Sequence, residues 1–214
     1  MNVILCRTYA GISSRINGGT HIPVNDIAIM RSIPEMYVAD PADGTELEQL
    51  LPAAAETEHP CYIRMPKGPL KNIFSEGISF SWGKGGQLTE DADITLISTG
   101  IITPEALEAT EILKQHKIAV RLIHIPSIKP IDAELVLKSA KESRYIVTAE
   151  NHSIIGGLGS AVLETISEES PRRLYRLGIE DVFCEGITES ELKKRHGINA
   201  SSIANTIIKL ENQH

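Results

Sequence analysis

The stretch INGGTHIPVNDIAIMRSIP places a histidine where it could contact a ligand. His21 follows the pair Gly18 and Gly19, and glycines permit a ligand to approach the backbone closely. A helix is expected to begin near Pro23, and the first backbone N–H groups of a helix can bind an anion. His21 is therefore a candidate site residue. The alternative is a histidine that lies on the surface or caps the helix.

Arg64 is a second candidate for ligand binding. It closes the short apolar stretch CYIR, which is typical of a buried strand. In parallel sheets, ligands bind at the carboxyl ends of the strands, where this arginine is expected to lie. A guanidinium can hold a phosphate through two parallel hydrogen bonds. The alternative for Arg64 is an ion pair that faces solvent.

A glycine cluster in ENHSIIGGLGSAV follows a predicted strand and precedes a predicted helix. It fits a dinucleotide fingerprint poorly, because Val162 occupies the third glycine position and Gly157 lies too far beyond the strand. Two other interpretations stay open. The glycines allow close packing and a tight entry to the helix, or the helix start contacts a partner or an anion. The sequence alone assigns no role to Gly156, Gly157 and Gly159.

The first 66 residues are predicted to form a small parallel sheet. Strands are expected at residues 3–7, 36–39 and 61–65, with a helix in each connection. This alternation implies right-handed crossovers and parallel pairing. Three short strands make an incomplete sheet, since a buried parallel sheet needs helices on both faces. The chain is therefore expected to begin partway through a domain.

The rest of the chain is predicted to contain a complete α/β unit. Residues 67–92 are rich in proline and glycine, which favours a linker followed by a hairpin. Residues 93–214 alternate strands and helices and end in two helices, at 189–195 and 201–210. The predicted fold class is α/β, with a three-layer α/β/α carboxyl-terminal domain preceded by a partial parallel-sheet domain.

Composition argues against several classes of partner. The net charge of -7 in 214 residues disfavours nucleic acid, which requires clustered cations. No apolar run reaches the roughly 18 residues of a membrane span, and the start MNVILCRTYAG lacks a secretory signal. Three scattered cysteines indicate reduced thiols, so the protein is expected in the cytoplasm. The histidines lack metal-ligand spacing, so no metal site is predicted.

Six stretches, in order along the chain, resemble the transketolase family. GGTHIPVNDIAIMRSIPEMYVADPADGTEL and YIRMPKG resemble its pyrimidine-binding domain. ITLISTG, IKPID, ENHSIIGGLGSAV and GITESELKKRHGI resemble its carboxyl-terminal domain. The resemblance implies that residues 1–66 are the second half of a pyrimidine-binding domain. Residues 93–214 are then the transketolase carboxyl-terminal domain, joined to the first by residues 67–92.

The resemblance also implies a function and its residues. Transketolases transfer a two-carbon ketol unit between sugar phosphates, using thiamine diphosphate and Mg²⁺. His21 matches a catalytic histidine near the substrate carbonyl, where it could donate to a developing oxyanion. Three residues match substrate-binding positions, and two of them depart from the family pattern. Arg64 matches the arginine that grips the sugar phosphate, Asn17 replaces a usual aspartate, and Tyr9 replaces a common histidine. These departures leave the donor and acceptor sugars open.

Parts of the family's active site have no counterpart in this sequence. They are the metal-holding amino-terminal domain and the glutamate that activates the cofactor. The chain alone is therefore expected to be inactive and to bind no cofactor, since acid–base assistance alone commonly contributes about 10²–10⁴-fold. The expected partner is an amino-terminal transketolase section or a second subunit, in a homo-oligomer or hetero-oligomer that acts on sugar phosphates.

Other functions share parts of this pattern. A deoxyxylulose-phosphate synthase and a 2-oxo-acid dehydrogenase beta-type subunit have the same spacing in GGTHIPVNDIAIMRSIP. A non-catalytic assembly module is a further alternative. The sequence also leaves open whether the chain is a natural split subunit or a truncated product.

Overall fold

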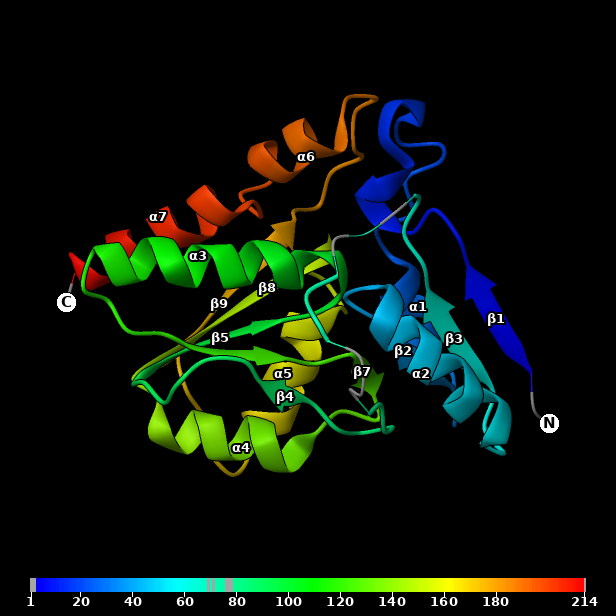
Figure 1. The fold of residues 1–214 in the computed structure, drawn as a ribbon, viewed down its shortest axis with the longest axis horizontal. Coiled ribbons are helices and arrows are strands. Elements are labelled where there is room, and N and C mark those ends of the chain that lie inside the picture. Colours follow the sequence, from blue (N-terminus) through cyan, green and yellow to red (C-terminus); the bar gives the residue numbers. More distant parts are fainter. Residues whose placement is uncertain (1–2, 69, 71, 76–78, 214) are drawn as a thin grey trace.

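The computed structural model describes residues 3–68, 70, 72–75 and 79–213. Within this part of the chain, two sheets lie side by side, each carrying helices on its faces (Figure 1). The predicted α/β fold class is confirmed. No helix of the described residues is both long and apolar enough to cross a membrane.

The first sheet has the strand order β1-β3-β2-β7. Strands β1 and β2 both run parallel to β3, as the sequence predicts, and β7 runs antiparallel to β2. The elements of this unit are β1 (Ile4–Arg7), the 3-10 helix η1 (Gly11–Asn17), α1 (Asp26–Ser32), β2 (Tyr37–Ala39), α2 (Gly44–Glu56) and β3 (Cys61–Arg64).

Helices α1 and α2 pack on opposite faces of this sheet. Ile27 of α1 packs with Val38 and Tyr62, while Leu50 and Ala54 of α2 pack with Ile63. The side chain of Asp43 caps α2 by accepting from the backbone N–H of Glu46 at 2.9 Å, as this residue type commonly does. Both helices therefore hold the central strands β2 and β3, whereas most of β1 stays exposed.

Helix α1 begins three residues later than the sequence predicts. Its first residue is Asp26 rather than Pro23. The carbonyl of Val24 accepts a 2.7 Å hydrogen bond from the backbone N–H of Ser153, a residue distant in sequence. This long-range contact coincides with the delayed helix start.

The second sheet has the strand order β4-β6-β5-β8-β9, with β4 antiparallel to β6 and the other pairs parallel. Its strands are β4 (Gly86–Gln87), β5 (Ile94–Ser98), β6 (Arg121–His124), β8 (Tyr145–Ser153) and β9 (Leu174–Ile179). The connecting elements are η2 (Gly100–Ile102), α3 (Thr103–Gln115), β7 (Ser127–Lys129), α4 (Ala133–Glu142), α5 (Leu158–Ile166), α6 (Glu189–Arg195) and α7 (Ala200–Glu211).

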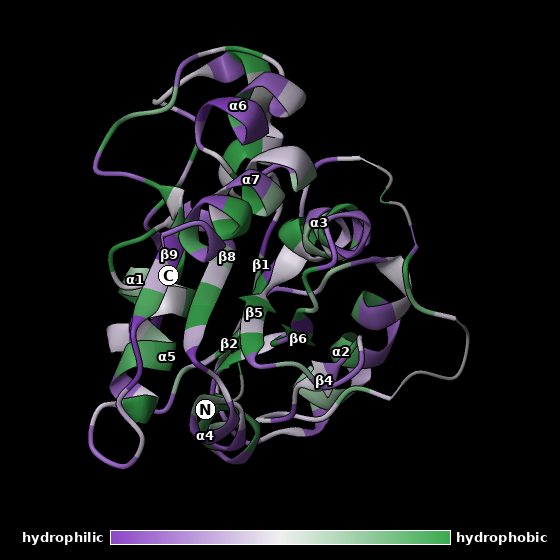
Figure 2. Cartoon of the chain, turned by 90° about the vertical axis from the view of Figure 1, so that its left-hand side faces the viewer, coloured by the Kyte–Doolittle hydropathy of each residue, from purple (hydrophilic) through white to green (hydrophobic). Residues whose placement is uncertain are grey.

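The second unit has the predicted three layers. Helices α3 and α7 cover one face of the sheet, where Leu113 and Ile203 pack with Leu96. Helices α4 and α5 cover the other, where Val136 and Val162 pack with Ile97 and its neighbours. Figure 2 shows hydrophobic residues along the inner strand β8 and a largely hydrophilic α6 at the periphery. The main core thus lies on both sides of β5 and β8.

The segment predicted as a linker and hairpin differs in detail. Its described residues contain a single short strand, β4, which pairs with the distant β6 rather than with a neighbouring strand. Trp82 donates from Nε1 to the carbonyl of Ala53 in α2 at 3.2 Å. The hairpin prediction is therefore wrong for these residues, because they bind along α2 and β6 instead of folding back on themselves.

The two units are joined by backbone hydrogen bonds as well as by packed side chains. Strand β7 lies in the second half of the sequence but completes the first sheet beside β2. Just beyond β2, the carbonyl of Asp40 accepts a 3.0 Å hydrogen bond from the N–H of Gly100, which has a φ of 55°. A Cβ at Gly100 would overlap the Asp40 carboxylate. Glycine is required here both by the left-handed backbone and by the close approach.

Gly100→Ala is expected to lower the free energy of unfolding by more than about 1 kcal/mol, because alanine is incompatible with this φ and with the nearby carboxylate. Urea unfolding followed by circular dichroism measures the change. Gly86→Ala is the matched control, since a Cβ there meets nothing within 4 Å. Equal stability of the two variants would contradict the assigned role of Gly100.

Candidate functional site

Three of the four predicted site residues lie on one segment at the carboxyl ends of β1 and β3. We call residues 9–24 the site loop. Ser14 joins two of the candidates, because its Oγ donates to the carbonyl of Tyr9 at 2.7 Å and its own carbonyl accepts from Asn17 Nδ2 at 3.1 Å. His21 follows on the same loop, and its N–H donates to the carbonyl of Gly18 at 2.9 Å. Tyr9, Asn17 and His21 are all exposed.

The imidazole of His21 is placed to act as a hydrogen-bond donor. Its Nδ1 lies 2.8 Å from Oγ1 of Thr20. When Thr20 donates this bond, the ring proton of neutral His21 lies on Nε2. That N–H is then available to an oxygen atom of a ligand, as expected of a group that stabilises a developing oxyanion.

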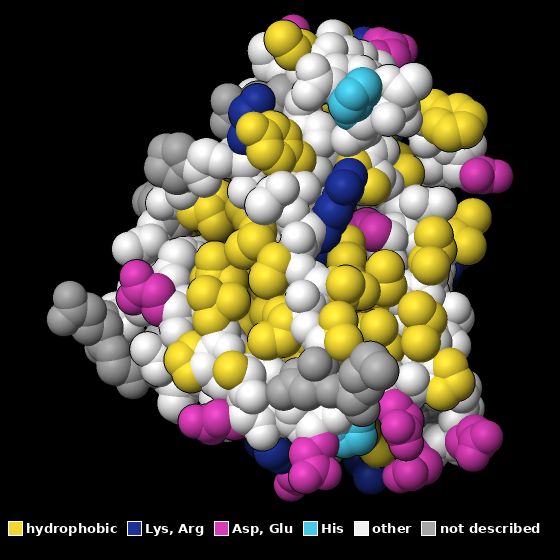
Figure 3. Space-filling model, turned by 90° about the vertical axis from the view of Figure 1, so that its right-hand side faces the viewer, with side chains coloured by type: hydrophobic (Ala, Val, Ile, Leu, Met, Phe, Trp, Pro, Cys, Tyr) yellow, Lys and Arg dark blue, Asp and Glu magenta, His cyan; other side chains and the backbone are white. Residues whose placement is uncertain are grey.

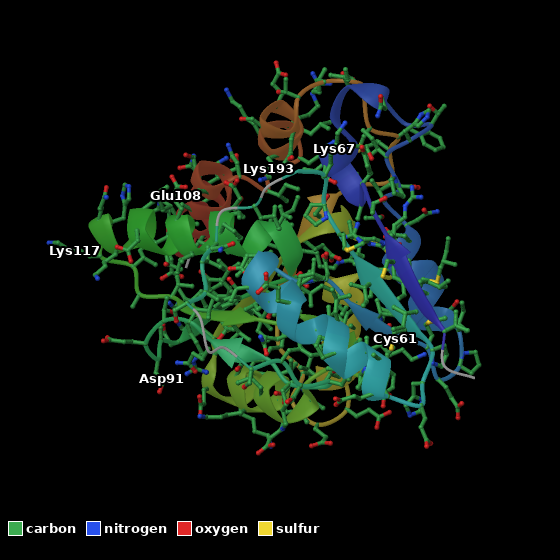
Figure 4. The ribbon with its side chains drawn as sticks, turned by 45° about the vertical axis from the view of Figure 1, so that its right-hand side comes forward. Cys61, Lys67, Asp91, Glu108, Lys117 and Lys193 are labelled. Carbon is green, nitrogen blue, oxygen red and sulfur yellow. The ribbon has the colours of Figure 1, made fainter. Side chains whose placement is uncertain are left out.

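Lys67 lies beside the site loop, and sequence reasoning did not single it out. Its Nζ lies 4.7 Å from the centre of the Tyr9 ring, a cation–π geometry. Figure 4 shows Lys67 at the η1 end of the first unit, and Cys61 at the opposite end of β3. The signal in the sequence was its position in RMPKG, three residues after the strand that ends at Arg64. A cation therefore accompanies Tyr9 at the rim of the site loop.

Arg64 lies in a different environment from the other candidates. Its side chain has 0% exposure, and its Nε and one terminal nitrogen donate to both carboxylate oxygens of Asp26 at 2.8 and 3.2 Å. It also donates to Asp40 at 3.0 Å and to the carbonyl of Asn151 at 3.0 Å. This buried guanidinium cannot contact a sugar phosphate in the conformation described. The structure gives Arg64 a structural role instead.

The two carboxylates that bind Arg64 differ electrostatically. Burial alone would raise the pKa of Asp26, but the charge of Arg64 and hydrogen bonds from Arg64 and Tyr62 outweigh burial and lower it. Asp40 receives one hydrogen bond from Arg64, and burial raises its pKa overall. Asp26 begins α1 and Asp40 follows β2, so the single cation of Arg64 connects both of these segments to the end of β3.

The glycine cluster surrounds a buried carboxylate. Glu150 accepts from the N–H groups of Leu158 and Gly159, at 2.6 and 2.9 Å, in the first turn of α5. A Cβ at Gly157 would overlap this carboxylate. The glycines therefore permit close packing and a tight entry to the helix, one of the two interpretations left open. The carboxylate of Glu150 occupies the helix start that an external anion would need.

Glu150 and His152 form a second pair of buried ionisable groups. Burial raises the pKa of Glu150 to about 7, against the opposing effect of the two amide hydrogen bonds. Burial and the charge of Arg64 lower the pKa of His152 to about 4. Neutral His152 donates from Nδ1 to the carbonyl of Ser153 and accepts at Nε2 from the N–H of Ala28 in α1, at 2.7 and 3.4 Å.

The described residues do not form a site for a metal-bound diphosphate. No group of three or more histidine, cysteine or carboxylate side chains in this part of the chain could hold a metal ion. The start of α5, which could otherwise bind an anion, is occupied by Glu150. We therefore derive no chemical step through thiamine diphosphate from these residues alone.

Solved structures of transketolases share this arrangement of sheets and helices. A structure described as a split gene transketolase, an inactive beta4 tetramer, shares 40% sequence identity, with a TM-score of 0.88 over 98% of this chain and 66% of that chain. Residues 1–72 match the transketolase pyrimidine binding domain, and residues 83–203 match the transketolase C-terminal domain. The chain belongs to the transketolase family.

Relatives within the family differ in what their names say they do. A 6-deoxy-6-sulfo-D-fructose transketolase subunit from Clostridium sp. is 41% identical over 95% of this chain and 63% of its own length. A 1-deoxy-D-xylulose-5-phosphate synthase from Caldanaerobacter subterraneus is 34% identical over 96% of this chain and 33% of its own length. The chain thus spans slightly less than two thirds of the length of the 6-deoxy-6-sulfo-D-fructose transketolase subunit.

Arg64→Leu is expected to lower the free energy of unfolding by about 3–5 kcal/mol, because it leaves two buried carboxylates without a cation. Urea unfolding provides the measurement. Arg144→Leu is the matched control: Arg144 also binds two carboxylates, Asp93 and Glu211, but its side chain is 45% exposed. The exposed pairs are worth less than about 1 kcal/mol each. A similar loss of unfolding free energy in both variants would show that the buried ion pairs of Arg64 stabilise the fold no more than exposed ones do.

Glu150 is expected to make stability depend on pH. Its pKa is about 7 in the folded chain against an ordinary 4.5, so its contribution is present below pH 4.5 and is lost as the pH rises towards 7. The free energy of unfolding relative to Glu150→Gln should fall by about 3 kcal/mol across this window. Urea titrations at several pH values measure it. A constant difference between the two proteins would show that Glu150 does not titrate there.

Proposed function

We propose that this chain is the carboxyl-terminal section of a thiamine-diphosphate-dependent transketolase, which transfers a two-carbon ketol unit between sugar phosphates. The observation that carries the proposal is the site loop, where His21, Asn17 and Tyr9 lie exposed on one segment at the carboxyl end of a parallel sheet. Family membership of both units supports it.

His21 has the catalytic role in this proposal. Its Nε2 faces away from the bond with Thr20, so it can donate to the substrate carbonyl oxygen as negative charge develops. Bound thiamine diphosphate supplies the nucleophilic carbon in the complete enzyme. Asn17 offers an amide to a substrate hydroxyl, although its Nδ2 already donates to Ser14.

The phosphate end of the sugar is assigned to Lys67 together with Tyr9. Arg64 is buried, whereas the Lys67 ammonium stacks on the exposed ring of Tyr9. A lysine ammonium binds phosphate as a point charge, and the tyrosine hydroxyl can add a hydrogen bond. The chemistry that resemblance assigned to Arg64 is thus proposed for a residue three positions further along.

A partner is proposed to complete the active site. It contributes the metal, the diphosphate-binding groups and the glutamate that activates the cofactor. Support comes from the exposed surface of the first unit, where β1 pairs on one side only, with β3. Val3, Leu5, Ile29 and Ile33 are exposed apolar residues of β1, α1 and their ends. Figure 3 shows an extended apolar area on the side that carries β1, which is typical of an interface.

The location and the alternative activity follow from the same observations. We propose that the assembled enzyme works in the cytoplasm, which the scattered reduced cysteines support. Deoxyxylulose-phosphate synthase activity is the alternative. It has support from more distant relatives, and it is distinguished by its substrates, pyruvate and a triose phosphate.

Reconstitution tests the proposal. The chain is mixed with the amino-terminal transketolase section from the same genome, thiamine diphosphate and Mg²⁺, and ketol transfer is assayed. Xylulose phosphate, fructose phosphate and 6-deoxy-6-sulfofructose are offered as donors, and pyruvate with a triose phosphate tests the alternative. The complex is expected to transfer ketol units, whereas the chain alone is expected to be inactive. Turnover by the purified chain alone would overturn the split-site proposal.

His21→Asn is expected to lower kcat of the complex by about 10²–10³-fold, the usual loss for one oxyanion donor. His116→Asn is the matched control, because His116 is an exposed histidine at the end of α3. It should leave kcat unchanged. If His21→Asn retains wild-type kcat, His21 has no catalytic role.

A further inference from the structure

The end of strand β8 contacts the site loop near both of its ends. Near the start of the loop, the side chain of Asn151 forms hydrogen bonds with Ala10 and Ile12. At the far end of the loop, the N–H of Ser153 donates to the carbonyl of Val24 at 2.7 Å. Residues that are more than 120 positions away in the sequence therefore fix both ends of the segment that carries Asn17 and His21.

Asn151 makes the contact at the start of the loop with both halves of its amide. Its Oδ1 accepts from the N–H of Ile12 at 3.0 Å, and its Nδ2 donates to the carbonyl of Ala10 at 3.4 Å. The residue is only 2% exposed, and its backbone carbonyl accepts from Arg64. An amide is the side-chain group that offers an acceptor and a donor in this planar arrangement.

Gly11 completes this contact from the side of the loop. Its φ is 57°, and a Cβ at this position would overlap the side-chain amide of Asn151. The backbone between Ala10 and Ile12 therefore lies directly against Asn151. Tyr9, with a φ of 61°, precedes this contact immediately. The position of the Tyr9 ring thus depends on a turn that Asn151 holds.

Helix α1, which follows the loop, is held by the same segment of the carboxyl-terminal unit. His152 accepts from the N–H of Ala28, and the carbonyl of Gly156 accepts from Arg31 at 2.8 Å. A second segment of the carboxyl-terminal unit lies along the loop, because a Cβ at Gly19 would meet Phe183 Cβ at 3.1 Å. These contacts restrict the loop between its two anchored ends.

We propose that Asn151 is a positioning residue for the transketolase reaction, acting through the site loop. This proposal rests on the proposed function. Asn151 does not touch the substrate; it fixes the turn at residues 10–12 and so places Tyr9 and the η1 segment that leads to Asn17 and His21. A displacement of about 1 Å of a catalytic group can reduce the rate by about 10²-fold. The carboxyl-terminal unit is thereby given a part in catalysis.

Hydrogen exchange in the chain alone tests the positioning. In Asn151→Ala, exchange of the Ile12 amide and of peptides from residues 10–24 should rise about tenfold or more, because the acceptor is lost. Peptides from β5 and β8 should exchange as in the wild type. Thr148→Val is the matched control, since Thr148 is buried on the same strand and its hydroxyl has no hydrogen-bond partner among the described residues. It should leave loop exchange unchanged.

Gly11→Ala provides an independent variant. It disturbs the same contact from the opposite side and leaves Asn151 intact, so it keeps the test decisive if Asn151→Ala folds poorly. Faster exchange in residues 10–24 is expected here too. Unchanged loop exchange in both variants overturns the proposal, as does an equal rise throughout the chain, which would indicate a purely structural role.

Kinetics of the reconstituted complex supply the second readout. Asn151→Ala should lower kcat/KM for the ketose donor about 10²-fold while the complex stays assembled. Asn151→Asp keeps the acceptor for Ile12 and should recover part of that loss. If kcat/KM follows only the folded fraction, the positioning role is refuted. If the wild-type complex transfers no ketol unit, the proposed function fails, whereas the exchange data still decide whether Asn151 holds the loop.

Discussion

The rest of the structure depends on the buried ion pairs of Arg64. One guanidinium binds Asp26 at the start of α1, Asp40 beyond β2 and the carbonyl of Asn151 at the end of β8. A buried cation with this many acceptors has few alternative arrangements, because any loss of a partner leaves a charge without solvent or counterion. The network therefore connects the two sheets, and Asn151, which accepts from Arg64, also forms hydrogen bonds with the start of the site loop. The exposed residues of the site loop are the candidates for binding and catalysis. The buried charges of Arg64, Asp26 and Asp40 form a separate group that holds the structure together.

The buried carboxylate of Glu150 explains a part of the sequence that resembled a ligand site. The carboxylate of Glu150 lies at the start of α5 and accepts hydrogen bonds from two backbone N–H groups. An external anion bound at a helix start would accept the same hydrogen bonds. Gly157 leaves room for that carboxylate. A glycine-rich turn after a strand therefore does not identify a nucleotide site by itself. What decides is which group accepts hydrogen bonds from the first N–H groups of the helix. Here that group is the carboxylate of Glu150, which belongs to the preceding strand β8.

Sequence patterns predicted the regular elements of the second unit well, because long alternating stretches carry a strong periodic signal. Helix α6 has the expected bounds, and the parallel pairing of the first sheet is confirmed. Tyr9, Asn17 and His21 lie on one segment because they are close in sequence. The burial of Arg64, the strand β7 and the contact of Lys67 with Tyr9 were not foreseen. Each arises from packing between distant segments, which neither residue type nor local spacing records.

Strand β7 has a consequence for how such chains can be recombined. The family's two domain models divide this chain at residues 72–83, yet β7 crosses that division and pairs with β2. A chimera joined at the boundary would import a foreign β7 against a native β2, and a foreign Asn151 against a native Arg64. The two halves are therefore not exchangeable modules. A chimera of two relatives should therefore take β2, Arg64, β7 and the end of β8 from the same parent. The segments that must stay together are those that contact one another across the two units, and no single domain contains all of them.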